Sequence, residues 1–435
     1  MRMNVKESTM VKPMAETPRG TLWLSNLDIQ ILGNYHSRSV YLYSSNGAAN
    51  FFDVGLLKAA LGRALVDFYP YAGRLEKADD GRLQINCNCE GVLFVVAECD
   101  AAVDDLGDFA ARAPDLSLVP KVDYSGGIST WPLLLLQLTR FKCGSISLGV
   151  TADHHVKDGT SGLHFINTWS DIARGVTSVA VPPVLDRRPL SARQPPQPKF
   201  PHDEYQPPPQ LITPLPITDT SHAVFKLTPD HLRAIKQSCS GYSTYQAVTG
   251  HVWRCVCAAR GLPPDQPTRL KFSVNGRPRL QPPLPPGLFG NVNFYTTSTA
   301  LCGELVSNPA GFAAEKVNGA VAQMNDEYLR SAIDYLEVQL PSILNTTARN
   351  ENLVKCPNLD ITSWVRLPFY EGDFGWGKPV YAGPAVVQYE GKAYLLLDPE
   401  SDGSWLLQIT LFKPHMDAFH NLFYDIPPST KNITI

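Results

Sequence analysis

Apolar positions occur in short blocks along the chain, and these blocks predict its strands. Residues 131–138 are almost continuously apolar, and residues 145–150 form a second strand-like run soon after. Runs of this length suit a buried strand, whereas a helix needs about ten residues or more. Residues 82–87 and 91–97 also predict strands. In the second half we expect further strands, at 292–299, 394–397 and 405–411.

Other segments repeat apolar residues every three or four positions, the spacing that places them on one face of a helix. This pattern holds for residues 53–65, where Asp53 is the expected N-cap, and for residues 163–173. In the second half, residues 229–236 and 243–260 are also predicted to be helical. Helices and strands mix without a regular period or an internal repeat, which predicts a mixed α/β fold.

One segment interrupts this pattern with a high density of proline. Twelve of the 37 prolines fall between residues 182 and 216. Proline fixes φ and removes a backbone donor, so such a segment is extended and irregular. A chain of 435 residues also suggests two domains of about 200 residues rather than one core. We therefore expect an N-terminal domain at 1–180, a crossover at 181–217 and a C-terminal domain at 218–435.

The composition is that of an ordinary globular protein, with 44% hydrophobic and 18% charged residues. The formal net charge is -3 without a block of like charges, which argues against nucleic acid or an anionic membrane as the main partner. No apolar leader or membrane-length run is present, so we expect a cytoplasmic protein. The nine cysteines, an odd number without the usual zinc spacings, are interpreted as reduced structural thiols.

The main chemical feature follows the second strand-like run. His154 and Asp158 form a His-x-x-x-Asp pair, and Gly159 comes next. With an ordinary pKa of about 6.5, a histidine at a strand end can take a proton from an alcohol. A metal site is a further reading, but it needs three or four convergent ligands, and no second ligand cluster lies nearby in the sequence. From this motif alone, catalysis and a structural role stay equally open.

A second motif, Asp373-Phe374-Gly375-Trp376-Gly377, lies more than 200 residues further along the chain. Together the two motifs resemble those of the plant acyl-CoA-dependent BAHD acyltransferases. The resemblance runs nearly end to end, with supporting stretches at 5–11, 68–75, 162–167, 356–359, 362–368 and 422–426. It is strongest to the branch that transfers hydroxycinnamoyl groups to shikimate or quinate. The family fold it implies is a pair of chloramphenicol-acetyltransferase-like domains with an active-site tunnel between them.

The resemblance also implies a mechanism. The acyl group would pass directly from CoA to an acceptor hydroxyl, with His154 as the general base. Acyl-CoA is then a substrate, and neither a cofactor nor a metal is expected. Asp158 would turn away from His154 and pair with Arg277, a structural role. The motif of Asp373, Gly375, Trp376 and Gly377 would likewise be structural, and we expect a monomer that binds only small-molecule substrates.

Further site residues follow from matches to the family motifs. Trp364 and Thr362 alternate along one predicted strand and can donate hydrogen bonds to the thioester oxygen as it gains charge. A core position for Trp364 is the alternative. Ser243 and Thr244 open a predicted helix, whose free N–H groups suit the phosphates of CoA.

Shikimate and quinate carry a carboxylate, which arginine binds well. Arg349, 7 residues before Cys356 and 13 before Thr362, matches the carboxylate-binding arginine of the family. His36, Ser39 and Tyr41 match a second motif and are candidate acceptor contacts.

Four residues, and the neighbours of Arg349, depart from the family pattern and put the acceptor in doubt while leaving the reaction intact. Ser37 stands where the family has threonine. Arg38 stands where the family has proline, Lys157 where it has a small residue, and Asp360 where it has glycine. For Arg38, a solvated surface charge and a role in the site are both open. The prediction is a p-coumaroyl or caffeoyl transferase acting on shikimate or quinate. The alternatives are a family member that uses another alcohol or an amine, and a non-catalytic homologue that binds acyl-CoA.

Overall fold

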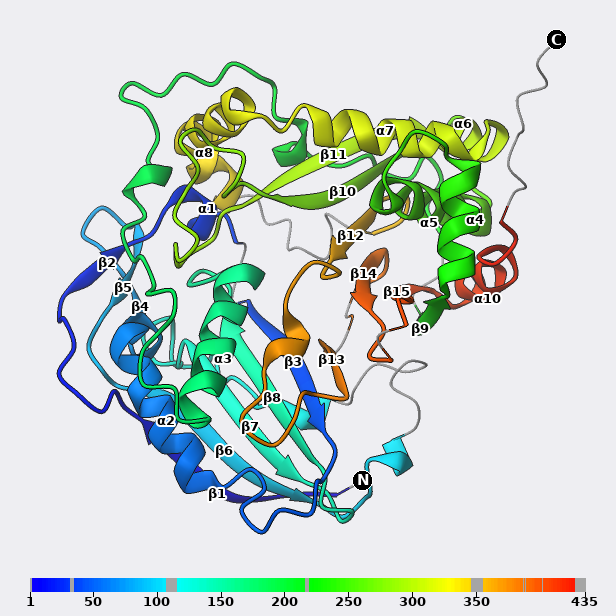
Figure 1. Ribbon diagram of the computed structural model, residues 1–435. Helices are drawn as coiled ribbons and strands as arrows, with labels where there is room; N and C mark the ends of the chain where they lie inside the picture. The colour runs from blue at the N-terminus through cyan, green and yellow to red at the C-terminus, as the bar shows by residue number, and fades with distance from the viewer. Residues whose placement is uncertain are drawn as a thin grey trace.

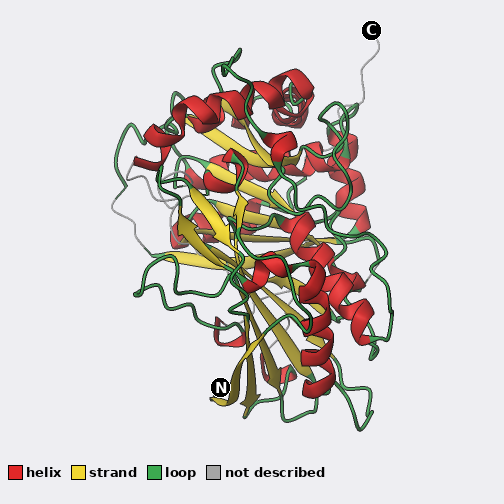
Figure 2. Cartoon of the chain, turned by 90° about the vertical axis from the view of Figure 1, so that its left-hand side faces the viewer, coloured by secondary structure: helices red, strands yellow, loops and turns green. Residues whose placement is uncertain are grey.

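The computed structural model describes residues 2–31, 35–106, 116–215, 219–345, 355–385, 387, 389–400 and 402–426. Within these ranges the strands form two six-stranded sheets and one three-stranded sheet. Figure 1 shows one large sheet below the other. In Figure 2 the strands run through the middle of the molecule, and helices lie around them.

The first large sheet comes mainly from the N-terminal half. Its strand order is β1 (Met3–Val11), β6 (Val92–Cys99), β7 (Leu134–Arg140), β8 (Ile146–Asp153), β3 (His36–Tyr43) and β13 (Tyr381–Pro384). Neighbouring strands are antiparallel except β6 and β7. Every residue of β8 is buried, because both faces of the strand are covered. The sequence of β8 alternates apolar residues with small or polar ones, and its polar residues Ser147, Thr151 and Asp153 are buried as well.

The second large sheet has one packed face and one more open face. Its order is β11 (Asn293–Leu301), β10 (Pro267–Asn275), β12 (Leu359–Ser363), β14 (Lys392–Leu397), β15 (Trp405–Phe412) and β9 (Thr220–Leu227). β12 runs parallel to β10 and β14, and the other pairs are antiparallel. Burial alternates along β10 and β11. Because side chains alternate between the faces of a strand, the less buried positions share one face.

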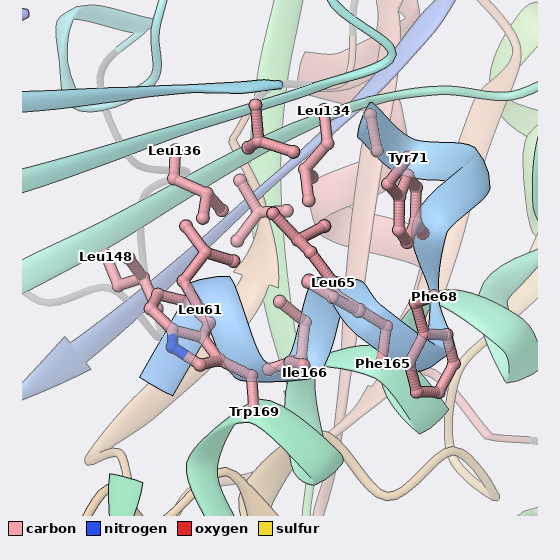
Figure 3. Packing of buried hydrophobic residues seen from close by; sticks show 14 of the residues in the cluster. Leu61, Leu65, Phe68, Tyr71, Leu134, Leu136, Leu148, Phe165, Ile166 and Trp169 are labelled. Atoms are coloured by element: carbon pink, nitrogen blue, oxygen red, sulfur yellow. The ribbon is translucent and has the colours of Figure 1, made fainter. Parts of the chain in front are cut away.

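Helices cover the outer faces of both sheets. α2 (Val54–Asp67) and α3 (Gly159–Ala173) pack together over the first sheet, and Figure 3 shows Leu61, Leu65, Ile166 and Trp169 of these helices in one cluster with the strand residues Leu134, Leu136 and Leu148. On the second sheet, α5 (Thr244–Arg260) and α7 (Ala310–Ala322) share one apolar cluster with the strands. The remaining helices are α1 (Asn26–Ile29), α4 (Pro229–Ser238), α6 (Cys302–Ser307), α8 (Asp326–Asn345) and α10 (Lys413–Leu422), and the small sheet holds β2 (Thr21–Trp23), β5 (Leu83–Asn86) and β4 (Arg74–Lys77).

The two halves of the chain interlock beyond the proline-rich segment. β13 lies in the second half of the sequence but pairs with β3 of the first sheet. Phe369 and Phe374 join the same apolar core as Trp169. The described part of the proline-rich segment, 181–215, contacts both halves: Arg193 forms an ion pair of 2.6 Å with Asp334 of α8, and Arg187 forms one of 3.1 Å with Asp28 of α1. The contiguous range 218–435 therefore contributes to both sheets.

Most predicted elements are present, with small changes at their ends. α2 begins after Asp53, whose side chain accepts the Leu56 amide as the predicted N-cap. The apolar runs at 131–138 and 145–150 form β7 and β8. Several elements were not predicted from the sequence, among them α7, α8, β3 and β10. The apolar positions of α7 are mostly alanine and therefore carry a weak pattern.

The described helices are not long and apolar enough to span a membrane. In the same residues, no three His, Cys, Asp or Glu side chains gather as metal ligands would.

Candidate active site

His154 is the first residue after β8, and its backbone is held on two sides. Its N–H donates to the Tyr35 carbonyl at 2.9 Å. Its own carbonyl accepts from Nδ2 of Asn291 at 2.8 Å. Asn291 comes from the second half and precedes β11, so the two halves jointly fix this peptide. The imidazole is thereby placed where the two sheets approach each other.

The His154 imidazole is suited to act as a base. Its Nδ1 is buried and has no hydrogen-bond partner among the described residues. Burial, together with the nearby charge of Lys157, lowers the pKa of His154 to about 4. The ring is therefore neutral at physiological pH and can accept a proton. The Tyr35 ring lies beside it, with the ring centres 5.6 Å apart.

The neighbouring His155 differs from His154 in its protonation. Its Nδ1 lies 2.8 Å from Oδ1 of Asp153, and its Nε2 lies 3.0 Å from the Ile31 carbonyl. Both partners are acceptors, so both ring nitrogens carry protons. Burial opposes that charge, but the Asp153 carboxylate outweighs it and raises the pKa of His155. His155 is thus a buried structural cation with no free nitrogen for a substrate.

Asp158 does not orient His154 but joins the two halves. It forms a two-pronged ion pair with Arg277, at 2.7 and 3.2 Å, as the family resemblance implied. Its carboxylate also caps α3 by accepting the Ser161 amide at 2.9 Å and accepts the Val292 amide at 2.9 Å. Burial would raise the pKa of Asp158, but Arg277 and these donors outweigh it and lower the pKa. The carboxylate is fully occupied, so it is not available as the third member of a triad.

A cavity of about 1250 Å³ opens between the two large sheets and includes His154 in its wall. Its lining comes from β3, β8 and α3 of the first half and from β10, β11, β12 and β14 of the second. Among the described residues its wall carries one acidic side chain, Asp360, and these basic ones: Arg38, Lys157, Lys236, Lys271, Arg279, Arg366 and Lys392. Such an excess of positive charge favours anionic ligands.

Trp364 and Thr362 both line this cavity. The Trp364 ring stacks on Phe369 with 4.4 Å between ring centres, and its indole N–H has no hydrogen-bond partner within the described part of the chain. The Thr362 hydroxyl accepts from Nζ of Lys392 at 2.6 Å. Because an ammonium can only donate, the hydroxyl keeps its own hydrogen for another acceptor. Both side chains can therefore donate toward a ligand, as the sequence suggested.

The candidate residues of β3 differ in the hydrogen-bonding groups that they present to the cavity. His36, Ser39 and Tyr41 all border the cavity. Both ring nitrogens of His36 are engaged, however, Nε2 by the Pro132 carbonyl at 3.0 Å and Nδ1 by the Tyr124 hydroxyl at 2.9 Å. A ligand would meet only the ring carbons of His36. Ser39 and Tyr41 keep hydroxyl groups at the cavity wall.

Other sequence candidates fall at the cavity or outside the described chain. Ser243 and Thr244 line the cavity at the start of α5, where the Ser243 hydroxyl accepts the Gln246 amide as the helix cap. Arg349 belongs to residues 346–354, which lie outside the described residues. Lys157 lines the cavity and donates to the Ser37 hydroxyl at 2.8 Å, and burial lowers the pKa of Lys157 to about 8.

The second sequence motif lies away from the cavity. Oδ1 of Asp373 accepts the amides of Gly375 and Gly377 at 2.8 and 3.0 Å, and both glycines have positive φ, at 102° and 111°. Phe374 packs edge-on against Trp169, 4.7 Å between ring centres, and Trp376 lies 5.0 Å from Phe52. None of the five residues borders the cavity. The motif forms a tight loop on the first core and does not line the cavity.

Several residues that shape the site were not found from the sequence. Asn291 holds the His154 carbonyl and also donates to Asp28, whose carboxylate pairs with Arg187 at 3.1 Å. Lys392 fixes the Thr362 hydroxyl. These are isolated polar residues with no motif around them. The only local sign was Asn291 beside Gly290, which is too common to interpret.

Comparison with known proteins assigns a family. Residues 1–426 match the Transferase family. A rosmarinate synthase from Plectranthus scutellarioides is 54% identical, and a shikimate O-hydroxycinnamoyltransferase from Nicotiana tabacum is 52% identical, each over 98% of this chain and 100% of the relative. The crystal structure of vinorine synthase has the same fold, with a TM-score of 0.75 at 23% identity over 98% of this chain and 99% of that one.

The fold with two chloramphenicol-acetyltransferase-like units, the cavity between them and the matched sequences agree. The chain belongs to the BAHD family, the acyl-CoA-dependent acyltransferases of the Transferase family.

Proposed function

We propose that this enzyme transfers a hydroxycinnamoyl group, p-coumaroyl or caffeoyl, from CoA to a hydroxyl of shikimate or quinate. The observation that carries the proposal is His154, a neutral imidazole in the wall of a cavity that both halves line. The relative from Nicotiana tabacum, named for transfer to shikimate, supports the acceptor class. The excess of basic side chains around the cavity suits CoA phosphates and an acceptor carboxylate.

The proposed reaction is a direct transfer within a ternary complex. His154 takes the proton of the acceptor hydroxyl as its oxygen attacks the thioester carbonyl carbon. Negative charge gathers on the carbonyl oxygen, where the Trp364 indole N–H and the Thr362 hydroxyl act as donors. The carbon–sulfur bond then breaks, and the CoA thiolate takes the proton back from His154. The ester and free CoA leave, and His154 returns to its neutral form.

In this proposal Ser243 and Thr244 meet the CoA phosphates at the start of α5, and Arg349 binds the acceptor carboxylate. Ser39 and Tyr41 contribute hydroxyl contacts to the bound substrates. Asp158, Arg277 and the loop from Asp373 to Gly377 hold the architecture. His36 supports β3 through its two protein hydrogen bonds.

The proposal is tested by measuring CoA release from p-coumaroyl-CoA with shikimate, quinate and an uncharged alcohol. We expect turnover with shikimate or quinate. The Arg349→Ala variant should lose about 2–5 kcal/mol in transition-state stabilisation with these acids, as kcat/KM. Turnover restricted to uncharged or cationic acceptors would discard the acceptor assignment. No turnover with any donor would favour a non-catalytic acyl-CoA-binding homologue.

A second candidate function has specific support. The rosmarinate synthase from Plectranthus scutellarioides is as similar to this chain as the shikimate enzyme is, at 54% identity. The acceptor of that reaction therefore belongs in the same assay. Turnover with it, but not with shikimate or quinate, would keep the transfer chemistry and replace the acceptor.

A further inference from the structure

The cavity face of the second sheet carries three charged side chains that the proposed mechanism does not use. Lys271 lies on β10, Asp360 on β12 and Lys392 on β14, and we call them the charged row. Strand register places Lys271 beside Asp360 and Asp360 beside Lys392. All three border the cavity. Three adjacent strands thus present a Lys–Asp–Lys sequence to the substrate space.

One lysine of the row is fully engaged by protein. Nζ of Lys392 lies 2.7 Å from Oδ1 of Asp360 and 2.6 Å from the Thr362 hydroxyl. The side chains of Lys392 and Asp360 are only 15% and 14% exposed. Asp360 therefore neutralises Lys392, and together they fix the hydroxyl of Thr362.

The other lysine lacks a carboxylate partner. In the described part of the chain, Lys271 forms no ion pair and no hydrogen bond; its Nζ lies over the Tyr295 ring, 3.7 Å from the ring centre. Burial lowers the pKa of Lys271, a sign that solvent does not compensate its charge. Two lysines against one aspartate leave the row with one net positive charge. That charge is matched by a ligand with one negative charge.

Aromatic rings connect the row to the catalytic histidine. The Tyr35 ring lies beside His154, and its hydroxyl is hydrogen-bonded to that of Tyr394. Tyr394 in turn lies under Nζ of Lys392, 5.0 Å from the ring centre. The row and His154 therefore border the same part of the cavity. An acceptor has to enter this part, because its hydroxyl must reach His154.

We propose that the charged row is the carboxylate subsite for the acceptor. Lys271 binds the carboxylate. The Asp360–Lys392 pair is neutral overall, so the charged row matches a ligand with a single negative charge, and the same pair orients Thr362. The inference deepens the proposed function and rests on it, because it assumes a hydroxy acid as acceptor. It adds Lys271 to Arg349 as a residue that selects acids over neutral acceptors.

The test compares shikimate with its methyl ester, which keeps the ring hydroxyls and removes the charge. For wild type we expect a clear preference for the acid. In Lys271→Met the KM for shikimate should rise by about 10- to 100-fold, the usual effect of losing a hydrogen bond to a charged group. The KM for methyl shikimate and for p-coumaroyl-CoA should change little. Lys271→Arg should restore much of the acid preference.

Lys236→Met is the matched control, since it removes a cavity lysine outside the row. It should leave the acid-to-ester ratio unchanged. Thermal melting of each variant separates a folding defect from a binding defect, and Lys271→Gln is a milder second variant. Quinate and the acceptor of the rosmarinate reaction are tested as acid and ester pairs alongside shikimate.

The outcomes distinguish the inference from the proposed function. If wild type uses another hydroxy acid but not shikimate or quinate, the proposed acceptor fails and the row is tested with that acid. If shikimate is turned over and Lys271→Met weakens acid and ester equally, the row has no carboxylate role. If the preference for the acid over its methyl ester is lost in Arg349→Met but kept in Lys271→Met, Arg349 and not Lys271 binds the carboxylate. Wild-type turnover of neutral acceptors alone would overturn both ideas.

Discussion

The two motifs that stand out in the sequence lie in different parts of the structure. The segment from His154 to Gly159 reaches the cavity, and within it a neutral His154 sits next to an ionised His155 and close to a fully paired Asp158. The segment from Asp373 to Gly377 lies on the first core and does not border the cavity. A motif can therefore mark a reacting group or the packing that holds it. The two are told apart by which atoms remain free to meet a ligand.

The largest expected effect separates the two adjacent histidines of the first motif. His154→Ala should lower kcat by about 100- to 10,000-fold, because the proposed general base is lost, while the unfolding midpoint stays near that of wild type. His155→Ala should instead lower the midpoint, since it leaves Asp153 buried without its cation. Steady-state kinetics and thermal melts on both variants check this. Equal losses of activity with unchanged melting would mean that His155 also takes part in the reaction.

The next largest effect concerns the ion pair that joins the halves. Arg277→Met leaves Asp158 buried and uncompensated, and should cost about 3–5 kcal/mol of unfolding free energy. Chemical denaturation measures this loss. Arg188→Met removes an exposed partner of Asp186 and should leave the midpoint almost unchanged. A stable Arg277→Met protein without activity would instead place the pair in the chemistry.

Substitutions in the second motif should lower the stability of the protein and leave its catalytic activity unchanged. Phe374→Ala removes a buried ring from the first core and should cost about 3 kcal/mol of unfolding free energy. The folded fraction, assayed well below the melting temperature, should keep its kcat/KM. Phe374→Leu should lose less stability than Phe374→Ala. Loss of turnover in a well-folded Phe374→Leu protein would contradict a purely structural motif.

The smallest effect is a shift in pH dependence. The proposed mechanism needs neutral His154, and the pKa of His154 is lowered to about 4, so kcat/KM should fall only as pH drops through about 4 and not near 6.5. The charge of Lys157 contributes to this lowering, so Lys157→Met should move the acidic limb to higher pH. A pH profile of kcat/KM, recorded over the pH range in which the protein is stable, measures the acidic limb of wild type and of Lys157→Met. An acidic limb that does not move in Lys157→Met would show that burial alone sets the pKa.

The sequence determined the local elements and the reaction class. The apolar runs predicted β7 and β8 because strands covered on both faces are rich in apolar residues, and Asp53 predicted the start of α2 through its cap. The two motifs and the family resemblance identified His154 and the Asp158–Arg277 pair. Such features are short-range or carried by a recognisable pattern, so they can be read without coordinates.

Only the tertiary structure decided how distant polar residues come together. Asn291 meets the His154 peptide across 137 positions of sequence, and β13 crosses into the sheet of the other half. The charged row exists because strand register places Lys271, Asp360 and Lys392 side by side on one sheet face. Nothing in their separate sequence contexts predicts this, since register and burial depend on the packing of the whole sheet. The same packing leaves His154 neutral and pairs His155 with Asp153, although the two residues are adjacent in the chain.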